Sequence, residues 1–260
     1  MDQSHSTKFD RLFALAVREQ RTRFAGGALG VLWAYFNPIF WIGFVVVFFQ
    51  FVGRTPPIAA GPEIFVATGI LPYSMFRQTI TAEVRIVVAN RYMSYLAPTS
   101  DTELMQASAL LEMVNIALTS LLILTAVSLI FAADAPADLG RVYLAIMLVW
   151  TLAVGVGSLF SVLSKLSDTF SRLVPVVLRP AFWISGIFFT ATELGASLQA
   201  IFWWNPLLQC VELLREGFFL GYQSPIAAPW YPAVFGAICM VLAATIERLP
   251  GSAQWTRHRI

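Results

Sequence analysis

Apolar residues are grouped along the chain into six long stretches, each with the length of a membrane-spanning helix. A bilayer core about 30 Å thick is crossed by roughly 20 consecutive apolar residues in a helix. The first stretch contains no charged residue, whereas the second contains Pro72, Arg77, Glu83 and Arg85. The pattern predicts an all-α membrane protein, a single domain over residues 1–260. Its six transmembrane helices are expected at residues 31–52, 63–88, 104–131, 142–163, 173–190 and 230–246.

A further helix is predicted before the first span, within residues 9–28. Apolar residues recur there at helical spacing, and arginines occupy other positions of the helical wheel. The arginines are Arg11, Arg18 and Arg21. This arrangement is typical of an amphipathic helix lying at the membrane interface with its basic side toward the headgroups. A plain surface anchor and a gating element are both compatible with the pattern.

The segment between the fifth and sixth spans, residues 192–229, is too apolar for a solvated loop. Asn205 and Pro206 interrupt it and have the order expected at the start of a new helix. Thr190 and Glu193 have the spacing of a capping box for the preceding helix. We therefore expect two short helices that dip into the membrane from the extracytoplasmic side as a re-entrant hairpin. Such backbone is tolerated only beside protein or a water-filled cavity, which favours a pathway nearby.

Composition and charge agree with this topology. Hydrophobic residues make up 58% of the chain and charged residues 12%, against about 25% charged in soluble domains. The mean hydropathy is +0.71. Twelve Lys and Arg residues fall on the side that holds both termini, and three fall on the other side. Cytosolic loops are enriched in Lys and Arg, so both termini are predicted to be cytosolic.

Several kinds of chemistry are absent from the sequence. The only histidines are His5 and His258, in the polar tails, and neither lysine, Lys8 or Lys165, ends a phosphate-binding loop motif. The two cysteines have no metal-binding spacing, and the spans contain no acidic cluster with metal-ligand spacing. We therefore expect no enzyme activity, no cofactor and no metal site in this chain. Any work that it performs requires energy from another subunit.

Charged residues within the spans are the main candidates for function. A charged side chain at a helix centre costs roughly 2.5 to 3.5 kcal/mol on insertion scales, so such residues usually face a protein interior or an aqueous cavity. Arg77 and Arg179 are in this position, whereas Glu83 and Arg85 lie close enough to the interface to extend toward it. Aromatic residues make up 14% of the chain. Together they suit a sugar polymer, although interfacial belts and packing use aromatic residues too.

Five blocks of sequence resemble one known family and occur in its order over nearly the whole chain. The blocks are REQRTRFAGGALGVLWAYFNPI (18–39), FVATGILPYSMFRQTI (65–80), ANRYMSYLAPTS (89–100), FWISGIFFT (182–190) and WNPLLQCVELLREGF (204–218). The family that they resemble is the ABC-2 type permeases that export capsular polysaccharide and lipopolysaccharide O-antigen, and the capsule-export branch of Gram-negative bacteria is the most similar. One departure is Asn37 before Pro38, where an acidic residue is more usual.

The resemblance implies a homodimeric permease in the bacterial inner membrane, bound to a separate cytosolic ATPase subunit that holds ATP and Mg. It implies that the cytosolic loop at residues 89–103 docks this ATPase. The implied coupling residues are Asn90, Arg91, Tyr92, Pro98 and Asp101. For the capsule branch it further implies a periplasmic adaptor of the polysaccharide co-polymerase type and an outer-membrane polysaccharide export channel.

The implied substrate is an acidic polysaccharide on a lipid terminus. Arginine binds carboxylates and phosphates well, so Arg23, Arg77 and Arg179 are candidate partners. The full set of candidate pathway residues adds Trp33, Tyr35, Phe36, Tyr73, Phe76 and Trp183. The re-entrant hairpin is expected to border the exit through Trp204, Asn205, Pro206, Glu212 and Arg215.

Three alternatives remain at this point. Within transport, the chain is compatible with an O-antigen exporter or with export of a smaller substrate. A membrane-embedded glycosyl- or acyltransferase would need a His or acidic constellation at the membrane face, which the sequence lacks. A purely structural membrane subunit would not need arginines inside its spans. Co-purification with a cytosolic ATPase separates transport from the other two classes.

Overall fold

The computed structural model describes residues 28–58, 60–93, 101–131 and 134–248. All secondary structure in these ranges is helical. The long helices are α2 (Ala28–Val52), α3 (Pro62–Met93), α4 (Asp101–Ile130), α5 (Leu139–Leu166), α6 (Asp168–Ile184) and α9 (Trp230–Arg248). Between α6 and α9 lie the 3-10 turn η1 (Ala191–Glu193) and the short helices α7 (Ala196–Phe202) and α8 (Pro206–Phe218). Each expected span thus coincides with a helix, and the expected N-terminal amphipathic helix lies outside the described residues.

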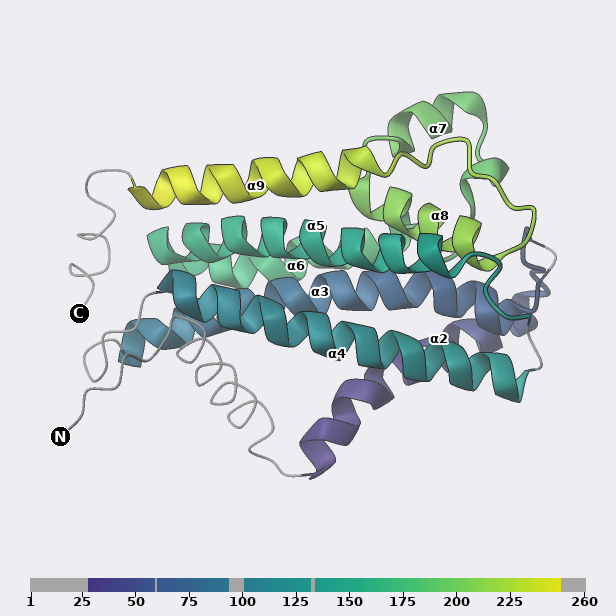
Figure 1. The fold of residues 1–260 in the computed structure, drawn as a ribbon, viewed down its shortest axis with the longest axis horizontal. Helices are drawn as coiled ribbons and strands as arrows, with labels where there is room; N and C mark the ends of the chain where they lie inside the picture. Colours follow the sequence, from purple (N-terminus) through teal and green to yellow (C-terminus); the bar gives the residue numbers. More distant parts are fainter. Residues whose placement is uncertain (1–27, 59, 94–100, 132–133, 249–260) are drawn as a thin grey trace.

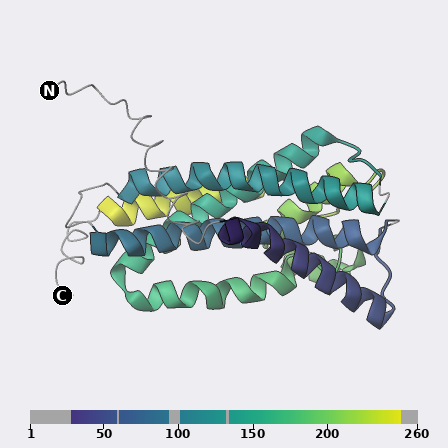
Figure 2. The ribbon, with the colours of Figure 1, turned by 90° about the horizontal axis from the view of Figure 1, so that it is seen from below.

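Helices α3 and α5 form the centre of the bundle. Helix α3 packs against α2, α4, α5, α6 and α8, and α5 packs against α8 and α9 on its other sides. Figure 1 shows α3, α4, α5 and α9 running side by side, with α2 leaving the bundle at an angle. Turned by 90°, Figure 2 shows α6 on the side of the bundle where α2 also projects. Helix α2 therefore reaches the rest of the fold mainly through α3, whereas α6 packs against both α5 and α3.

Glycines allow α5 to approach its neighbours closely. A Cβ added to Gly155 would clash with the backbone oxygen of Gly236 on α9. One added to Gly157 would lie 3.3 Å from the Cα of Ile80 on α3. Small residues are typical where helix backbones meet in membrane proteins, because packing rather than the hydrophobic effect holds such helices together.

Three of the helices are long and apolar enough to cross a membrane: Thr102–Ile130, Leu139–Leu166 and Trp230–Arg248. Part of α2, Phe36–Val52, is apolar but shorter. Helix α3 has 32 residues and α6 has 17. Many large apolar side chains of α2, α4 and α9 are exposed on the outside of the bundle, as in a protein surrounded by lipid.

The segment from the fifth span to the sixth differs in part from the prediction. Helix α6 ends at Ile184 rather than continuing to Thr190, because Gly186 has a φ of +81° that breaks the helix. The capping box of Thr190 and Glu193 is present, but it starts η1 and not α7, whose N-cap is Gly195. Asn205 caps α8 as predicted, by accepting hydrogen bonds from the backbone N–H groups of Leu207 and Leu208 at 3.1 and 3.3 Å.

Candidate functional site

Helices α2, α3 and α6 enclose a cavity of about 570 Å³, and half of the residues that line it are aromatic. We call it the α2–α6 groove. Its polar lining consists of Asn37, Tyr73, Ser74, Arg77, Gln78 and Arg179, and its apolar lining of Trp41, Phe44, Val45, Phe48, Ile70, Phe182, Trp183 and Phe188. Three other cavities along the described helices have no arginine in their lining and so lack this combination of aromatic faces and guanidinium groups.

The aromatic rings of the groove, apart from that of Phe48, form one connected cluster. Phe182 of α6 lies at its centre, 5.4 Å from the ring of Trp41 on α2 and 5.1 Å from that of Tyr73 on α3. Trp183 and Phe188 stack at 5.1 Å with ring planes 15° apart. Trp183 is nevertheless 65% exposed. The cluster therefore joins three helices while leaving aromatic surface open to a ligand.

The two arginines of the groove have no carboxylate partner among the described residues. Arg77 lies beside the hydroxyl of Tyr73, which donates a hydrogen bond to the backbone oxygen of Leu178 on α6 at 3.3 Å. Arg179 is exposed, one residue before Pro180. Charged groups at membrane depth normally face a partner or water. Two guanidinium groups without a carboxylate partner in one cavity could offer charge-assisted hydrogen bonds to an anion.

The structure brings some of the predicted pathway residues together and separates others. Tyr73, Arg77, Arg179 and Trp183 line the groove. Phe76 is buried in the core instead, and Phe36 is exposed on α2 with its ring 6.0 Å from that of Phe40. Arg23 and the side chains of Trp33 and Tyr35 lie outside the described part of the chain.

Several residues that line the groove were not predicted from the sequence to be pathway residues. On α2 they are Asn37, Trp41, Phe44 and Phe48, which recur at intervals of four, three and four residues. That spacing places them on one face of a helix. The spacing alone shows that these residues share a face of the helix. It does not show that the face lines a groove, because aromatic side chains on a span are equally expected to face lipid or a packed core.

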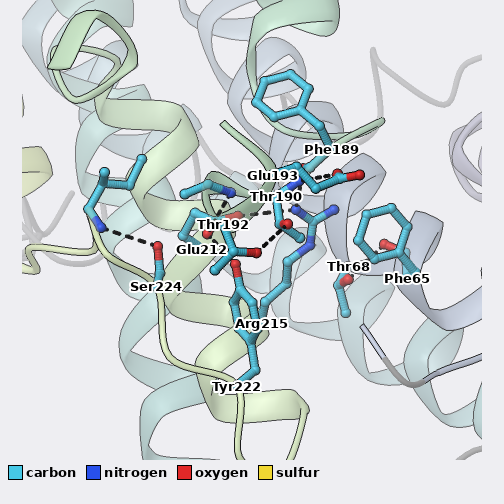
Figure 3. Close-up of polar contacts among 12 residues, drawn as sticks. Phe65, Thr68, Phe189, Thr190, Thr192, Glu193, Glu212, Arg215, Tyr222 and Ser224 are labelled. Carbon is cyan, nitrogen blue, oxygen red and sulfur yellow. Dashed lines mark hydrogen bonds and ion pairs between the residues drawn. The ribbon is translucent and has the colours of Figure 1, made fainter. Parts of the chain in front are cut away.

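The predicted exit residues Glu212 and Arg215 form a buried ion pair (Figure 3). Both side chains are 0% exposed, and Arg215 Nη1 lies 3.2 Å from Glu212 Oε1. Arg215 also donates from Nη1 to the backbone oxygen of Phe189 at 2.8 Å and lies 4.1 Å above the ring of Phe65 on α3. Tyr222 donates to Glu212 Oε2 at 2.6 Å. Burial, followed by the neighbouring Glu212 carboxylate, raises the pKa of Tyr222.

This network fixes one wall of the groove. The Glu212 carboxylate also accepts from the backbone N–H of Ala191 at 3.3 Å, so both ends of the 189–191 segment are tied to α8. Phe188, which stacks on Trp183 in the groove, directly precedes that segment. Glu212 and Arg215 therefore act on the groove through the backbone, without lining it.

The remaining predicted exit residues lie at the surface end of α8. Trp204 is 69% exposed, and its ring contacts that of Trp203 at 5.4 Å. Asn205 donates to the backbone oxygen of Ile184 at 2.8 Å, so it connects the start of α8 to the end of α6. On the same side, Arg54 after α2 pairs with Glu193 of η1 at 3.2 Å, with both side chains more than a third exposed.

The predicted coupling residues are only partly within the described chain. Asn90, Arg91 and Tyr92 lie in the last turn of α3, which continues to Met93, beyond the predicted end of the second span. Asp101 begins α4, and Pro98 lies outside the described residues. The described ranges contain no group of three or more His, Cys, Asp or Glu side chains that could hold a metal ion.

Comparison with known proteins identifies relatives over most of the chain. The family model described as ABC-2 type transporter matches residues 10–219. The polysialic acid transport protein KpsM of Escherichia coli is 28% identical over 94% of both chains. The capsule polysaccharide export inner-membrane protein BexB of Haemophilus influenzae is 26% identical over 79% of this chain and 78% of its own. The corresponding protein CtrC of Neisseria meningitidis is 24% identical over 90% of this chain and 88% of its own.

Proposed function

Because the chain belongs to the ABC-2 type transporter family, we propose that it is the permease subunit of an ATP-driven exporter of lipid-linked capsular polysaccharide in the bacterial inner membrane. The named functions of the relatives support this: one is a polysialic acid transport protein and two are capsule polysaccharide export inner-membrane proteins. The chain itself performs no chemistry on its cargo. A separate cytosolic subunit binds and hydrolyses ATP.

The α2–α6 groove carries this proposal. Its exposed Trp183 and the neighbouring aromatic faces offer stacking surfaces for the apolar faces of sugar rings. The unpaired Arg77 and Arg179 supply positive charge for the carboxylates of an acidic polymer or for the phosphate of its lipid terminus. A sugar polymer that slides through a transporter needs many weak, interchangeable contacts, which an aromatic wall with two arginines would provide.

Assembly and topology follow from the same premise. The groove of one chain would face a second copy, so that the exposed aromatic side of α2 is covered in a homodimer. Both termini would lie in the cytosol, and residues 89–103 would contact the ATPase. The η1, α7 and α8 segment would form the re-entrant element at the extracytoplasmic exit, where a periplasmic adaptor and an outer-membrane export channel receive the polymer. The spans α2, α3 and α6 would then cross the membrane with the three more apolar helices.

The proposal is tested by exchanging the groove arginines in cells that make the polymer. Replacing both Arg77 and Arg179 with Ala should lower surface polysaccharide at least tenfold and leave polymer in the cytosol, while the amount of protein in the membrane is unchanged. Arg172→Ala is the matched control, because Arg172 is an exposed arginine of α6, the helix of Arg179, and does not line the groove. Normal export by the double variant would refute the assignment of the groove.

A further inference from the structure

A further titratable residue of the predicted second span, Glu83, does not line the α2–α6 groove. Glu83 of α3 is 0% exposed. Its Oε2 accepts a hydrogen bond from Ser158 of α5 at 3.3 Å, and α5 approaches so closely that a Cβ on Gly157 would lie 2.7 Å from that oxygen. Its Oε1 has no hydrogen-bond partner among the described residues. A buried polar atom of this kind requires an explanation.

The carboxyl faces a cavity of about 440 Å³ between α4, α5 and α9. The polar residues in its lining are Glu83, Thr102, Gln106, Ser158 and Glu247. Thr102 lies at the start of α4 and Glu247 at the end of α9, so the polar lining extends from the helix ends inward to Glu83. Polar side chains are therefore spaced along the cavity from the helix ends toward Glu83, which is itself fully buried.

The charged surroundings of Glu83 do not favour its ionised form. Glu112 of α4, 1% exposed, interacts electrostatically with it as a like charge. Lys165 of α5, in the next turns beyond Ser158, is engaged by Glu247 of α9 at 2.7 Å. Arg85 is exposed on another side of α3. Two neighbouring carboxyl groups in an apolar interior favour one bound proton.

We propose that Glu83 is a proton-binding site of the membrane domain, which takes its proton from cytosolic water through the α4–α5–α9 cavity and holds it beside Glu112. The step is a simple protonation, in which an O–H bond forms on the Glu83 carboxylate and the proton comes from water. We assign the proton to Glu83 because Glu83 lines the α4–α5–α9 cavity, whereas Glu112 does not. Other buried hydroxyls without a hydrogen-bond partner among the described residues lie on α3, at Thr79, and on α5, at Ser161 and Ser164.

The proton has a consequence that rests on the proposed function. Helices α3 and α4 flank residues 94–100, and Glu83 and Glu112 lie about three turns from that segment on either side. Loss of the proton would place two like charges between these helices. The site would thus bias the separation of the two helices that carry the proposed ATPase contact.

Infrared difference spectroscopy of the purified full-length permease in lipid tests the site without substrate or ATPase. At neutral pH the wild type should show the carbonyl band of a protonated, buried carboxylic acid. Glu83→Gln should lose this band, whereas Glu103→Gln, a carboxyl of α4 outside the cavity, should keep it. In Glu112→Gln the band should disappear at a lower pH than in the wild type, because the like charge is gone.

Thermal unfolding of the same variants keeps the test decisive. Glu83→Gln mimics the neutral carboxyl and should unfold at the same temperature as the wild type. A wild type without the carboxylic acid band, or a band that survives in Glu83→Gln, would overturn the proposal. A large loss of stability in Glu83→Gln without such a band would overturn it too, by showing that Glu83 is an ionised partner of a cation. None of these readouts depends on polysaccharide export, so failure here leaves the proposed function standing.

Discussion

Two pairs of charged residues within apolar segments differ in their surroundings. Glu212 and Arg215 are fully buried, bonded to each other and to backbone, and covered by the ring of Phe65. Arg77 and Arg179 share a cavity open to a ligand and have no carboxylate partner among the described residues. The comparison shows that a charge within an apolar segment does not by itself indicate function. Whether the charge is paired separates the structural role of Glu212 and Arg215 from the binding role that we propose for Arg77 and Arg179.

The comparison predicts that removing an arginine lowers the stability of the protein where the arginine is paired and buried. Arg215→Ala should destabilise the protein by about 3–5 kcal/mol, because it leaves the Glu212 carboxylate buried and unpaired. Thermal unfolding in detergent measures this loss. The double variant Glu212→Gln with Arg215→Met removes both charges and should recover most of the stability. Equal stability of Arg215→Ala and the wild type would remove the distinction between the two pairs.

The start of α8 provides a smaller test with a neutral side chain. Asn205→Ala should cost about 1 kcal/mol for the lost cap and somewhat more for the lost bond to Ile184. Asn205→Asp keeps the cap acceptor and loses only the donor, so its thermal midpoint should fall between those of the wild type and the Ala variant. If the Asp variant were as unstable as the Ala variant, the cap would not be what holds α8.

The smallest effect is expected at Tyr222, which hydrogen-bonds to the buried pair. Its raised pKa means that the fold keeps this hydroxyl protonated to a higher pH than the unfolded chain does. The stabilisation is therefore present below the ordinary tyrosine pKa of 10.0 and is lost as the pH rises further. Tyr222→Phe should lose about 1 kcal/mol at neutral pH. Thermal midpoints of the variant and the wild type should then converge under alkaline conditions, and a constant gap would contradict the assignment.

Much of the fold was predictable from the sequence because long apolar stretches leave few alternatives in a bilayer. Each of the six expected spans coincides with a helix, and the Asn205 cap was correct. The end of the fifth span was predicted wrongly, because apolar residues continue after Ile184 whereas the helix ends where the backbone turns at Gly186. Composition records which residues avoid water, but it does not record where a single glycine turns the chain.

The candidate site was predictable only in its charged part. Arg77 and Arg179 were identified because arginine is costly in a span. Trp41, Phe44 and Phe48 were not, since an aromatic residue suits lipid, core and groove alike. The buried pair of Glu212 and Arg215 was assigned to the exit, although their i,i+3 spacing also suits an ion pair along a helix. Whether such a pair is solvated depends on packing that the sequence does not display.

The central claim, that the α2–α6 groove binds an acidic polymer, is tested most directly by the affinity of the purified permease for an acidic oligosaccharide. Trp41 and Trp183 lie in the groove, so their fluorescence reports binding. Replacing Arg77 and Arg179 with Ala should weaken binding at least tenfold, since each charge-assisted bond contributes about 1.5–3 kcal/mol. Arg172→Ala should bind like the wild type. Equal affinity in all three proteins would contradict the account.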